Sequence, residues 1–262
     1  VLLKDRDRDP FAFGFVFQIV VAIFFLAYTL ITKTLEFPNL SGLTLNLIVM
    51  TLFYSLGSIF IFKAFNLAEA SEVSIIFASS TIWSVITAII LLGEKLTLKN
   101  VLGIICIVLG IAAINFTKKS WHINKGHLFA LSGALFFGVA FTNDAYIISR
   151  YQSVSSYMIL AFSFPAIMSL ILNPKSIKNI TNFTQKSTIL NLLLCAVFYA
   201  LSALTIFSAY KVGGKASIIS PIQQTSIVIT VILSYFLLKE KDHLVNKIIG
   251  AVFSFIGVLF LI

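Results

Sequence analysis

Nine apolar stretches separated by short polar connections dominate the residue pattern of this chain. A helix needs about 20 mostly apolar residues to cross a bilayer, because its backbone polar groups must all pair within the helix. Most of the stretches have this length, and they lack the short alternating segments of membrane β-barrels. The stretches cover residues 11–32, 43–62, 73–92, 98–116, 128–148, 157–172, 189–209, 217–238 and 245–262. The pattern therefore predicts an all-α polytopic membrane protein with nine helices in this chain.

An internal repeat is the second pattern, because residues 54–114 recur loosely as residues 199–261. The matching motifs are Ile61-Phe62 and Ile206-Phe207, Ala70-Ser71 and Ala216-Ser217, Leu92-x-Glu94-Lys95 and Leu238-x-Glu240-Lys241, and Gly103/Gly110 and Gly250/Gly257. The displacement drifts from 145 to 147 residues along the chain, as two diverged copies of one unit would. In a chain this apolar, such a repeat favours a transporter over other functions.

The register of the repeat also gives the relative orientation of the two copies. Stretches 73–92 and 98–116 correspond to 217–238 and 245–262, which lie five apolar stretches further along the chain. Each crossing of the membrane reverses the direction of the chain, and five is an odd number. The sequence therefore predicts that the second copy is inverted relative to the first.

The same register predicts the limits of the two repeats. It pairs stretch 11–32 with 157–172 and leaves 128–148 without an equivalent, which would have to precede Val1. We therefore expect a five-plus-five arrangement of helices whose first helix is missing from this chain. On this interpretation, the first repeat covers residues 1–117 with four helices, and the second covers residues 118–262 with five.

The composition agrees with lipid as the solvent around the helices. Hydrophobic residues make up 59% of the 262 residues and charged residues only 11%, whereas about 25% of residues in soluble domains are charged. The chain has a net charge of +9, and its Lys and Arg residues lie between the apolar stretches, where they can anchor helices in the membrane. We therefore expect no nucleic-acid partner. Cys106 and Cys195 lie inside apolar stretches, which indicates small buried side chains rather than a disulfide or a metal site.

The polar residues form no catalytic constellation in the sequence. His122, His127 and His243 are the histidines of the chain, and all three fall in connections between apolar stretches. The spacing of the first two does not place their imidazoles on one helical face, and the common zinc-protease, esterase and phosphate-loop motifs are absent from the sequence. We therefore expect a protein that is not an enzyme and that uses no cofactor or metal.

Two copies of a local motif carry a resemblance to a known family. A polar-speckled helix ends in Leu92-Gly93-Glu94-Lys95 and is followed by a glycine-striped helix, and this order recurs at Leu238-Lys239-Glu240-Lys241. The chain resembles the EamA-type ten-helix members of the drug/metabolite transporter superfamily over essentially its whole length. The resemblance implies a secondary transporter, or exporter, of small metabolites such as amino acids, with a central cavity between the two repeats.

These observations predict where the protein lies and what it contacts. We expect an integral multi-pass protein of a bacterial-type inner (plasma) membrane, whose partners are the lipid bilayer and a small-molecule substrate. A proton as the coupling ion and a second copy of the chain, in a homodimer, are further candidate partners.

Polar side chains inside two equivalent apolar stretches are the first candidates for substrate contacts. Stretches 73–92 and 217–238 place hydroxyl, amide and indole groups where hydrocarbon is expected, and such groups are costly there without a partner or a wet cavity. The candidate residues of this cavity are Ser79, Ser80, Trp83, Ser220, Gln223 and Gln224. For the serines, the alternative is helix packing, because small side chains let helices approach closely.

Asn143 and Asp144 complete the candidate cavity residues, within stretch 128–148. A carboxylate inside a membrane is costly to ionise and is a functional-site hypothesis by default. A group of this kind suits a proton-coupled exporter. The alternative is an interfacial aspartate that pairs with Arg150 or Lys211.

Two rival functions depend on other polar side chains. Lys63 and Lys211 would favour exchange of a phosphorylated sugar or another organic anion if they face the cavity, although charges at helix ends more often lie among lipid headgroups. A lipid-handling or scaffold protein would be favoured if no cavity exists and Gln223 and Gln224 are bonded to neighbouring helices.

Two further sets of residues are predicted to be structural. Glu94 and Glu240 each precede the last helix of a repeat, where a carboxylate can accept from free backbone N–H groups and favours the positive end of the helix dipole. The glycines lie seven residues apart on one face of their helices, which predicts close helix packing. They are Gly103, Gly110, Gly250 and Gly257.

Overall fold

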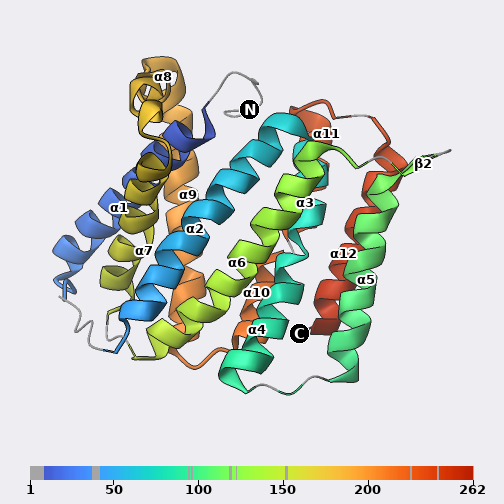
Figure 1. The fold of residues 1–262 in the computed structure, drawn as a ribbon, viewed down its shortest axis with the longest axis horizontal. Helices are drawn as coiled ribbons and strands as arrows, with labels where there is room; N and C mark the ends of the chain where they lie inside the picture. Colours follow the sequence, from blue (N-terminus) through green and yellow to red (C-terminus); the bar gives the residue numbers. More distant parts are fainter. Residues whose placement is uncertain are drawn as a thin grey trace. The chain divides into compact units, whose positions relative to one another are not determined.

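The computed structural model describes residues 9–36, 42–93, 95, 97–117, 120–121, 123–150, 153–224, 226–240 and 242–261, and these residues are almost wholly helical (Figure 1). The helices are α1 (Pro10–Thr32), α2 (Thr44–Leu67), α3 (Ala70–Phe77), α4 (Ser80–Leu92), α5 (Leu98–Asn115), α6 (Lys125–Arg150), α7 (Val154–Leu172), the 3₁₀ helix η1 (Pro174–Asn179), α8 (Thr181–Thr184), α9 (Lys186–Lys211), α10 (Ala216–Gln224), α11 (Ser226–Leu237) and α12 (Leu244–Leu261). Between α5 and α6, the two-residue strands β1 (Phe116–Thr117) and β2 (Ser120–Trp121) pair antiparallel. The predicted all-α class is confirmed.

Seven helical segments of the described chain are long and apolar enough to cross a membrane. Two of them, Ala70–Leu92 and Ala216–Leu237, consist of two helices in series, which are α3–α4 and α10–α11. Two shorter apolar helices cover Leu98–Ala113 and Leu244–Phe260. Together these segments correspond to the nine apolar stretches of the sequence, and each is a helix because lipid offers no other partner for backbone polar groups.

Local sequence explains where individual helices begin and end. Asp9 precedes α1, and its carboxylate accepts hydrogen bonds from the N–H groups of Phe11 and Ala12. Pro10 occupies the first helical position, where its missing N–H leaves no hydrogen bond unmade. Gly93 ends α4 with a φ of 67°, a left-handed conformation that a residue without a Cβ adopts freely.

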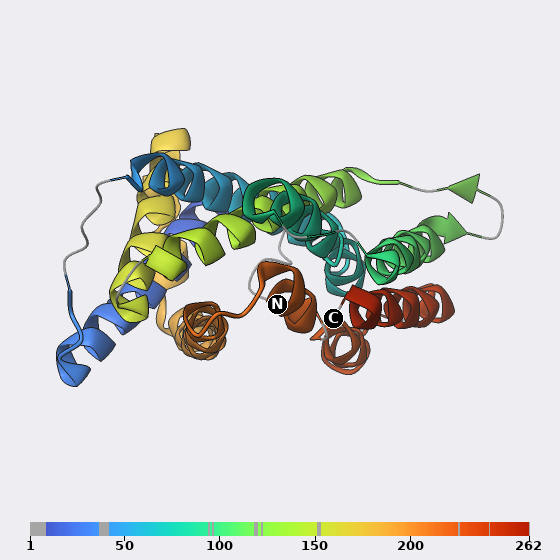
Figure 2. The ribbon, with the colours of Figure 1, turned by 90° about the horizontal axis from the view of Figure 1, so that it is seen from below.

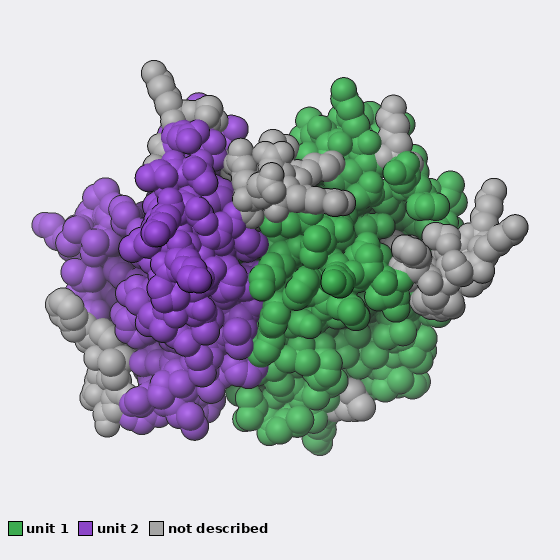
Figure 3. All heavy atoms as spheres, turned by 45° about the horizontal axis from the view of Figure 1, so that its top comes forward, with its two compact units in different colours: residues 1, 60–142, 215–262 green, residues 2–59, 143–214 purple. Residues whose placement is uncertain are grey.

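The described helices divide into two compact units (Figure 3). The first unit comprises residues 60–142 and 215–262, and the second comprises residues 2–59 and 143–214. Each unit therefore combines segments from both predicted repeats. The division of the sequence into repeats at residue 117 stays a prediction.

Segments that the repeat makes equivalent pack against each other within each unit, and the two halves of the interrupted segments pair crosswise. In the first unit, α5 packs along α12, α3 packs on α11, and α4 packs on α10. In the second unit, α1 packs along α7. Both ribbon views show α5 and α12 side by side (Figures 1 and 2). Each repeat thus supplies one member of every one of these pairs.

The glycine stripes show that α5 and α12 are antiparallel. Gly110 faces Gly250 and Ser254, while Gly257 faces Gly103, so residue numbers rise along one helix as they fall along the other. A Cβ on Gly110 would lie 2.7 Å from the Gly250 carbonyl oxygen, and a Cβ on Gly257 would lie 2.6 Å from the Gly103 carbonyl oxygen. The two backbones can approach this closely only because the side chains are absent. Antiparallel packing of equivalent helices agrees with the predicted inverted repeat.

The apolar core of the first unit surrounds α3. Val73, Ile75 and Ile76 of α3 are buried together with Ile107 of α5 and Val258 of α12. This short helix is therefore packed on more than one side, and it leads directly to the interruption before α4.

Candidate functional site

A carboxylate lies fully buried in the part of a membrane-spanning helix that belongs to the second unit. Asp144 belongs to α6 and has an exposed fraction of 0%. Both of its oxygens accept hydrogen bonds from tyrosines, since Tyr54 of α2 donates to Oδ2 and Tyr157 of α7 donates to Oδ1 over 2.5 Å. Hydrogen bonds to a charged acceptor are stronger than neutral ones, so the two phenols stabilise a charge that lipid would not.

Aromatic residues from α9 pack beside Tyr157, one of the two donors to this carboxylate. Tyr199 and Tyr210 lie close enough to Asp144 to interact with its charge. Phe207 contacts the rings of both Tyr157 and Tyr210, with centroid distances of 6.0 and 6.2 Å. Within the described part of the chain, the Tyr210 hydroxyl is buried and has no hydrogen-bond partner. The carboxylate therefore lies among phenols contributed by α2, α7 and α9.

Asn143, the neighbour of Asp144, connects α6 to α2. Asn46 Nδ2 donates to Asn143 Oδ1 over 2.7 Å, and Asn143 Nδ2 donates back to the Asn46 carbonyl oxygen over 2.9 Å. Arg150, one of the alternative partners of Asp144, lies with its guanidinium 3.6 Å from the centre of the Tyr146 ring. Asp144 is thus bonded to tyrosines whereas Arg150 lies against Tyr146, and a functional role of Asp144 stays a prediction.

The other candidate cavity residues lie in the first unit, on the interrupted helices. Ser79 lies between α3 and α4, is buried, and donates to the Ile76 carbonyl oxygen over 2.7 Å. Ser80 begins α4 and accepts a hydrogen bond from Gln224 Nε2 of α10 over 3.0 Å. Both Ser80 and Gln224 are buried. This bond joins the two segments that the repeat makes equivalent.

Three candidates on these helices keep polar atoms unsatisfied or exposed. Ser220 is fully buried, and its hydroxyl has no hydrogen-bond partner among the described residues. Gln223 is partly buried, and over the same residues its Oε1 also has none. Trp83 of α4 is 36% exposed. A buried polar atom without a partner carries a free-energy cost, so these atoms are ready to accept bonds from a polar ligand or water.

Some polar residues of α4 serve helix packing instead. A Cβ on Gly138 of α6 would lie 2.4 Å from the Ser80 carbonyl oxygen and 2.5 Å from the Trp83 Cβ, so α4 and α6 are in close contact. Thr142 of α6 donates to the Ser84 carbonyl oxygen over 3.0 Å. The packing role that the sequence left open for the serines therefore applies to this face of α4.

Glu240 caps a helix, but not the one that the sequence predicts. Its carboxylate accepts from the N–H groups of Ala70 and Ser71, over 3.0 and 3.2 Å, and from the Ser71 hydroxyl over 2.8 Å. These donors belong to the first turn of α3, whereas α12 begins only at Leu244. Glu240 thus lies too far before α12 to cap it, and that expectation is wrong. Glu94, its equivalent, lies outside the described residues.

Two charged contacts beside this cap are absent from the sequence-based expectations. Lys247 of α12 is 2% exposed and pairs with Glu69, just before α3. His127 Nε2 lies 3.2 Å from Glu72 Oε2, which becomes an ion pair when the imidazole is protonated. Lys247 could have been recognised as a charge within the apolar stretch 245–262. Its partner could not, because the pair joins residues 178 positions apart.

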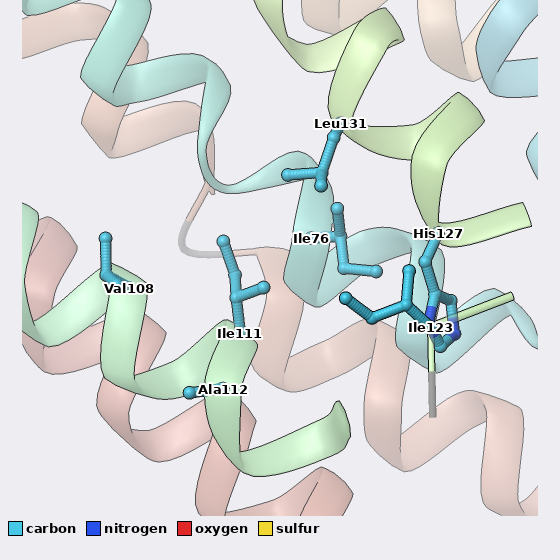
Figure 4. Close-up of a pocket in the computed structure, with 7 residues that line it drawn as sticks. All are labelled: Ile76, Val108, Ile111, Ala112, Ile123, His127 and Leu131. Carbon is cyan, nitrogen blue, oxygen red and sulfur yellow. The ribbon is translucent and has the colours of Figure 1, made fainter. Parts of the chain in front are cut away.

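An apolar pocket in the first unit is separate from the candidate residues (Figure 4). It has a volume of about 190 Å³. Its lining residues are Ile76, Val108, Ile111, Ala112, Ile123, His127 and Leu131. None of these residues is a predicted cavity residue.

Comparisons with known proteins now identify the family. The model of the EamA-like transporter family matches residues 4–116 and 124–262. A solved structure described as "Crystal structure of protein" shares the fold, with 15% sequence identity and a TM-score of 0.65 over 97% of this chain and 87% of that chain. No curated protein matches the sequence. Because the family model covers nearly the whole sequence, this chain belongs to the EamA-like transporter family and is a membrane transporter of small solutes.

Proposed function

We propose that this transporter exports a small metabolite, such as an amino acid or a related compound, and that a proton bound at Asp144 is the coupling ion. The observation that carries the proposal is the fully buried carboxylate of Asp144 between the hydroxyl groups of Tyr54 and Tyr157. A buried ionisable group in a membrane helix is characteristic of proton relays in transporters.

The hydrogen bonds of Asp144 suggest how a proton could act on the helices. As a carboxylate, Asp144 accepts from both phenols, which come from α2 and α7. Once it is protonated, one of its oxygens becomes a donor, and the phenol facing that oxygen must turn its own hydrogen elsewhere. Proton uptake would therefore remove a buried charge and rearrange a link between α6 and a neighbouring helix, as a coupled switch requires.

Substrate binding is assigned to the polar groups of α4 and α10. The unpaired atoms of Ser220 and Gln223 offer hydrogen bonds to a polar solute, and the bond between Gln224 and Ser80 can open to offer two more groups. In this proposal the solute occupies a cavity between the two repeats, which opens alternately to the two sides of the membrane.

Transport by purified protein in proteoliposomes tests the coupling. With a radiolabelled mixture of amino acids as substrate, a pH gradient should drive accumulation by the unchanged protein. Asp144→Asn keeps the size of the side chain but cannot take up a proton, so it should abolish pH-driven accumulation while exchange at equal pH continues.

Asp242→Asn is the matched control for this experiment. It removes an exposed carboxylate from the connection before α12 and should leave both activities unchanged. Accumulation that still responds to the pH gradient in Asp144→Asn would rule out this residue as the coupling site.

The rival functions receive less support from the described contacts. Lys63, which an anion exchanger would need in its cavity, has its ammonium 5.5 Å from the centre of the Phe129 ring, and Lys211 is an exposed residue at the end of α9. A scaffold role requires that both glutamines be bonded to neighbouring helices. Gln224 is bonded in this way, but the buried Oε1 of Gln223 has no partner among the described residues.

A further inference from the structure

A set of charged residues in the first unit fastens the start of α3 to the second repeat. We call this set the α3 clamp, and it comprises Glu69, Glu240 and Lys247. Glu69 directly precedes α3 and pairs with Lys247 of α12. Glu240 accepts from the N–H groups of Ala70 and Ser71 at the first turn of α3. One short helix of the first repeat is therefore held by two charged residues of the second.

The burial of the clamp makes its geometry specific. Lys247 is 2% exposed, and Glu240 is 3% exposed. Charges removed from water to this extent are strongly unfavourable unless they are paired, so each charge needs its partner in place. The pair of Glu69 and Lys247 is buried at the lysine end, whereas the Glu69 side chain is 29% exposed, and the buried lysine favours the position of α3 and α12 in which its partner is within reach.

The repeat allows the residues of the ion pair to be compared with the residues at the equivalent positions of the other copy. Its register places Lys215 at the position of Glu69 and Asn100 at the position of Lys247. A lysine and an asparagine cannot form an ion pair. Asn100 uses its side-chain oxygen to accept from the Thr97 N–H over 2.8 Å, at the start of α5. An ion pair between these two positions is thus possible in one copy of the repeat and not in the other.

The clamp is connected to the candidate cavity by a short rigid element. α3 has eight residues and therefore spans roughly 12 Å, and Ser79 lies two residues beyond its last residue, Phe77. Beyond this point, Ser80 makes the hydrogen bond to Gln224 that joins the two interrupted segments. A shift at the start of α3 would therefore be transmitted to the polar residues at its end.

We infer that the pair of Glu69 and Lys247 is a latch that acts at one end of α3 only, and that its release exposes the region of Ser79 and Ser80 to one face of the membrane. Loss of the pair removes one of the contacts that hold α3 against α12, on which it packs together with α11. The inference rests on the alternating opening proposed above. On this inference, opening toward one face of the membrane and opening toward the other are controlled by different contacts.

Thiol labelling tests the latch without knowledge of the substrate. In protein whose Cys106 and Cys195 are changed to serine, Ser79→Cys places a single thiol at the end of α3. A membrane-impermeant maleimide is then added to right-side-out and to inside-out vesicles. Lys247→Met should raise the labelling rate about tenfold from one face, in line with typical coupling between two states, and leave the other face unchanged.

Matched variants separate the latch from general loosening of the protein. Lys239→Met removes an exposed lysine from the connection between α11 and α12 and should leave labelling unchanged at both faces. Lys247→Arg keeps the charge, so the thiol at position 79 should be labelled as slowly as in the protein with Lys247. The double variant Glu69→Lys and Lys247→Glu exchanges the two charges and restores an ion pair. Its labelling rate should therefore be lower than that of Lys247→Met.

Two results would overturn the inference. Unchanged labelling in Lys247→Met means that the pair does not control access, and an equal rise from both faces means that it only stabilises the fold. Glu69→Gln gives the same readout if Lys247→Met does not fold. A negative result for proton coupling at Asp144 would not affect these rates, because labelling needs neither substrate nor a pH gradient.

Discussion

At the scale of single residues, Asp9 shows how a charged group outside the membrane-spanning segments stabilises a helix start. Burial raises the pKa of its carboxyl group, but the hydrogen bonds that it accepts outweigh burial, and its pKa lies below the ordinary 3.8. The donors include the N–H group of Phe11 at 2.9 Å and Asn179 Nδ2 at 2.9 Å. Asp9 thus caps α1 and connects it to η1.

Replacement of Asp9 should destabilise the protein in a pH-dependent way. Asp9→Ala removes the cap of α1, and we expect a loss of about 1 kcal/mol at neutral pH. Because the pKa of the folded state is lowered, the contribution is fully present above about pH 4 and disappears as the pH falls through the folded value. Thermal unfolding in detergent at pH 7 and pH 3 checks this, with Asp242→Ala as control. An equal difference between Asp9→Ala and the unchanged protein at both pH values would contradict the prediction.

Single residues also show the limit of sequence reasoning about the site. Asp144 was recognisable because a carboxylate within an apolar stretch is unusual. Its partners were not, because Tyr54 and Tyr157 come from other helices and tyrosines are equally common at membrane interfaces. Spacing along the chain identifies residues on one helix face, but not the face of another helix that meets them.

At the scale of elements, the interruption between α3 and α4 has a local cause. The sequence predicts one segment over residues 73–92, and the structure divides it at Ala78 and Ser79. Ser79 donates through its hydroxyl to the Ile76 carbonyl oxygen, and Thr81 does the same to that of Ala78. Hydroxyl groups that bond to nearby backbone carbonyls compete with helical hydrogen bonds. The length of an apolar run predicts the crossing of the membrane, but not such a break within it.

The antiparallel pair of α5 and α12 yields a prediction of its own. Gly257→Val adds a branched side chain where a Cβ alone would lie 2.6 Å from the Gly103 carbonyl oxygen and 2.7 Å from the Ile107 Cγ1. The helices must move apart, and overpacking of this kind costs about 1–3 kcal/mol. Thermal unfolding in detergent measures the loss. Leu109→Val, on an exposed part of α5, is the control, and equal stability of both variants would contradict the predicted close packing.

At the scale of the whole molecule, counting segments was enough to predict how equivalent helices are oriented. An odd displacement of the repeat implies inversion, and the crossing of Gly110 with Gly250 and of Gly257 with Gly103 has the antiparallel sense that inversion requires. This works because the bilayer restricts each segment to one of two directions. The pairing of α5 with α12 and of α1 with α7 agrees with the repeat. The charged pairs at the ends of helices cannot be predicted from it.

The two groups of candidate residues should control different quantities if both serve one transport cycle. Gln224 belongs to the first unit and Asp144 to the second. Gln224→Ala removes a hydrogen-bonding group assigned to the solute and should raise the KM for transport several-fold with its pH dependence unchanged. Asp144→Asn should remove the pH dependence and keep the KM of exchange, and the double variant should show both effects.

A screen of cells that carry the gene first identifies the exported metabolite. Export assays with this metabolite then measure the KM and its pH dependence. Thr230→Ala, which removes an exposed hydroxyl from α11, is the control for Gln224→Ala. Expression and thermal stability of every variant must match those of the unchanged protein, because a loss of folding lowers the maximal rate rather than shifting KM. Normal KM values in well-folded Gln223 and Gln224 variants would show that these glutamines do not contact the solute. A pH dependence that disappears in Gln224→Ala as well would mean that one group, not two, carries both binding and coupling.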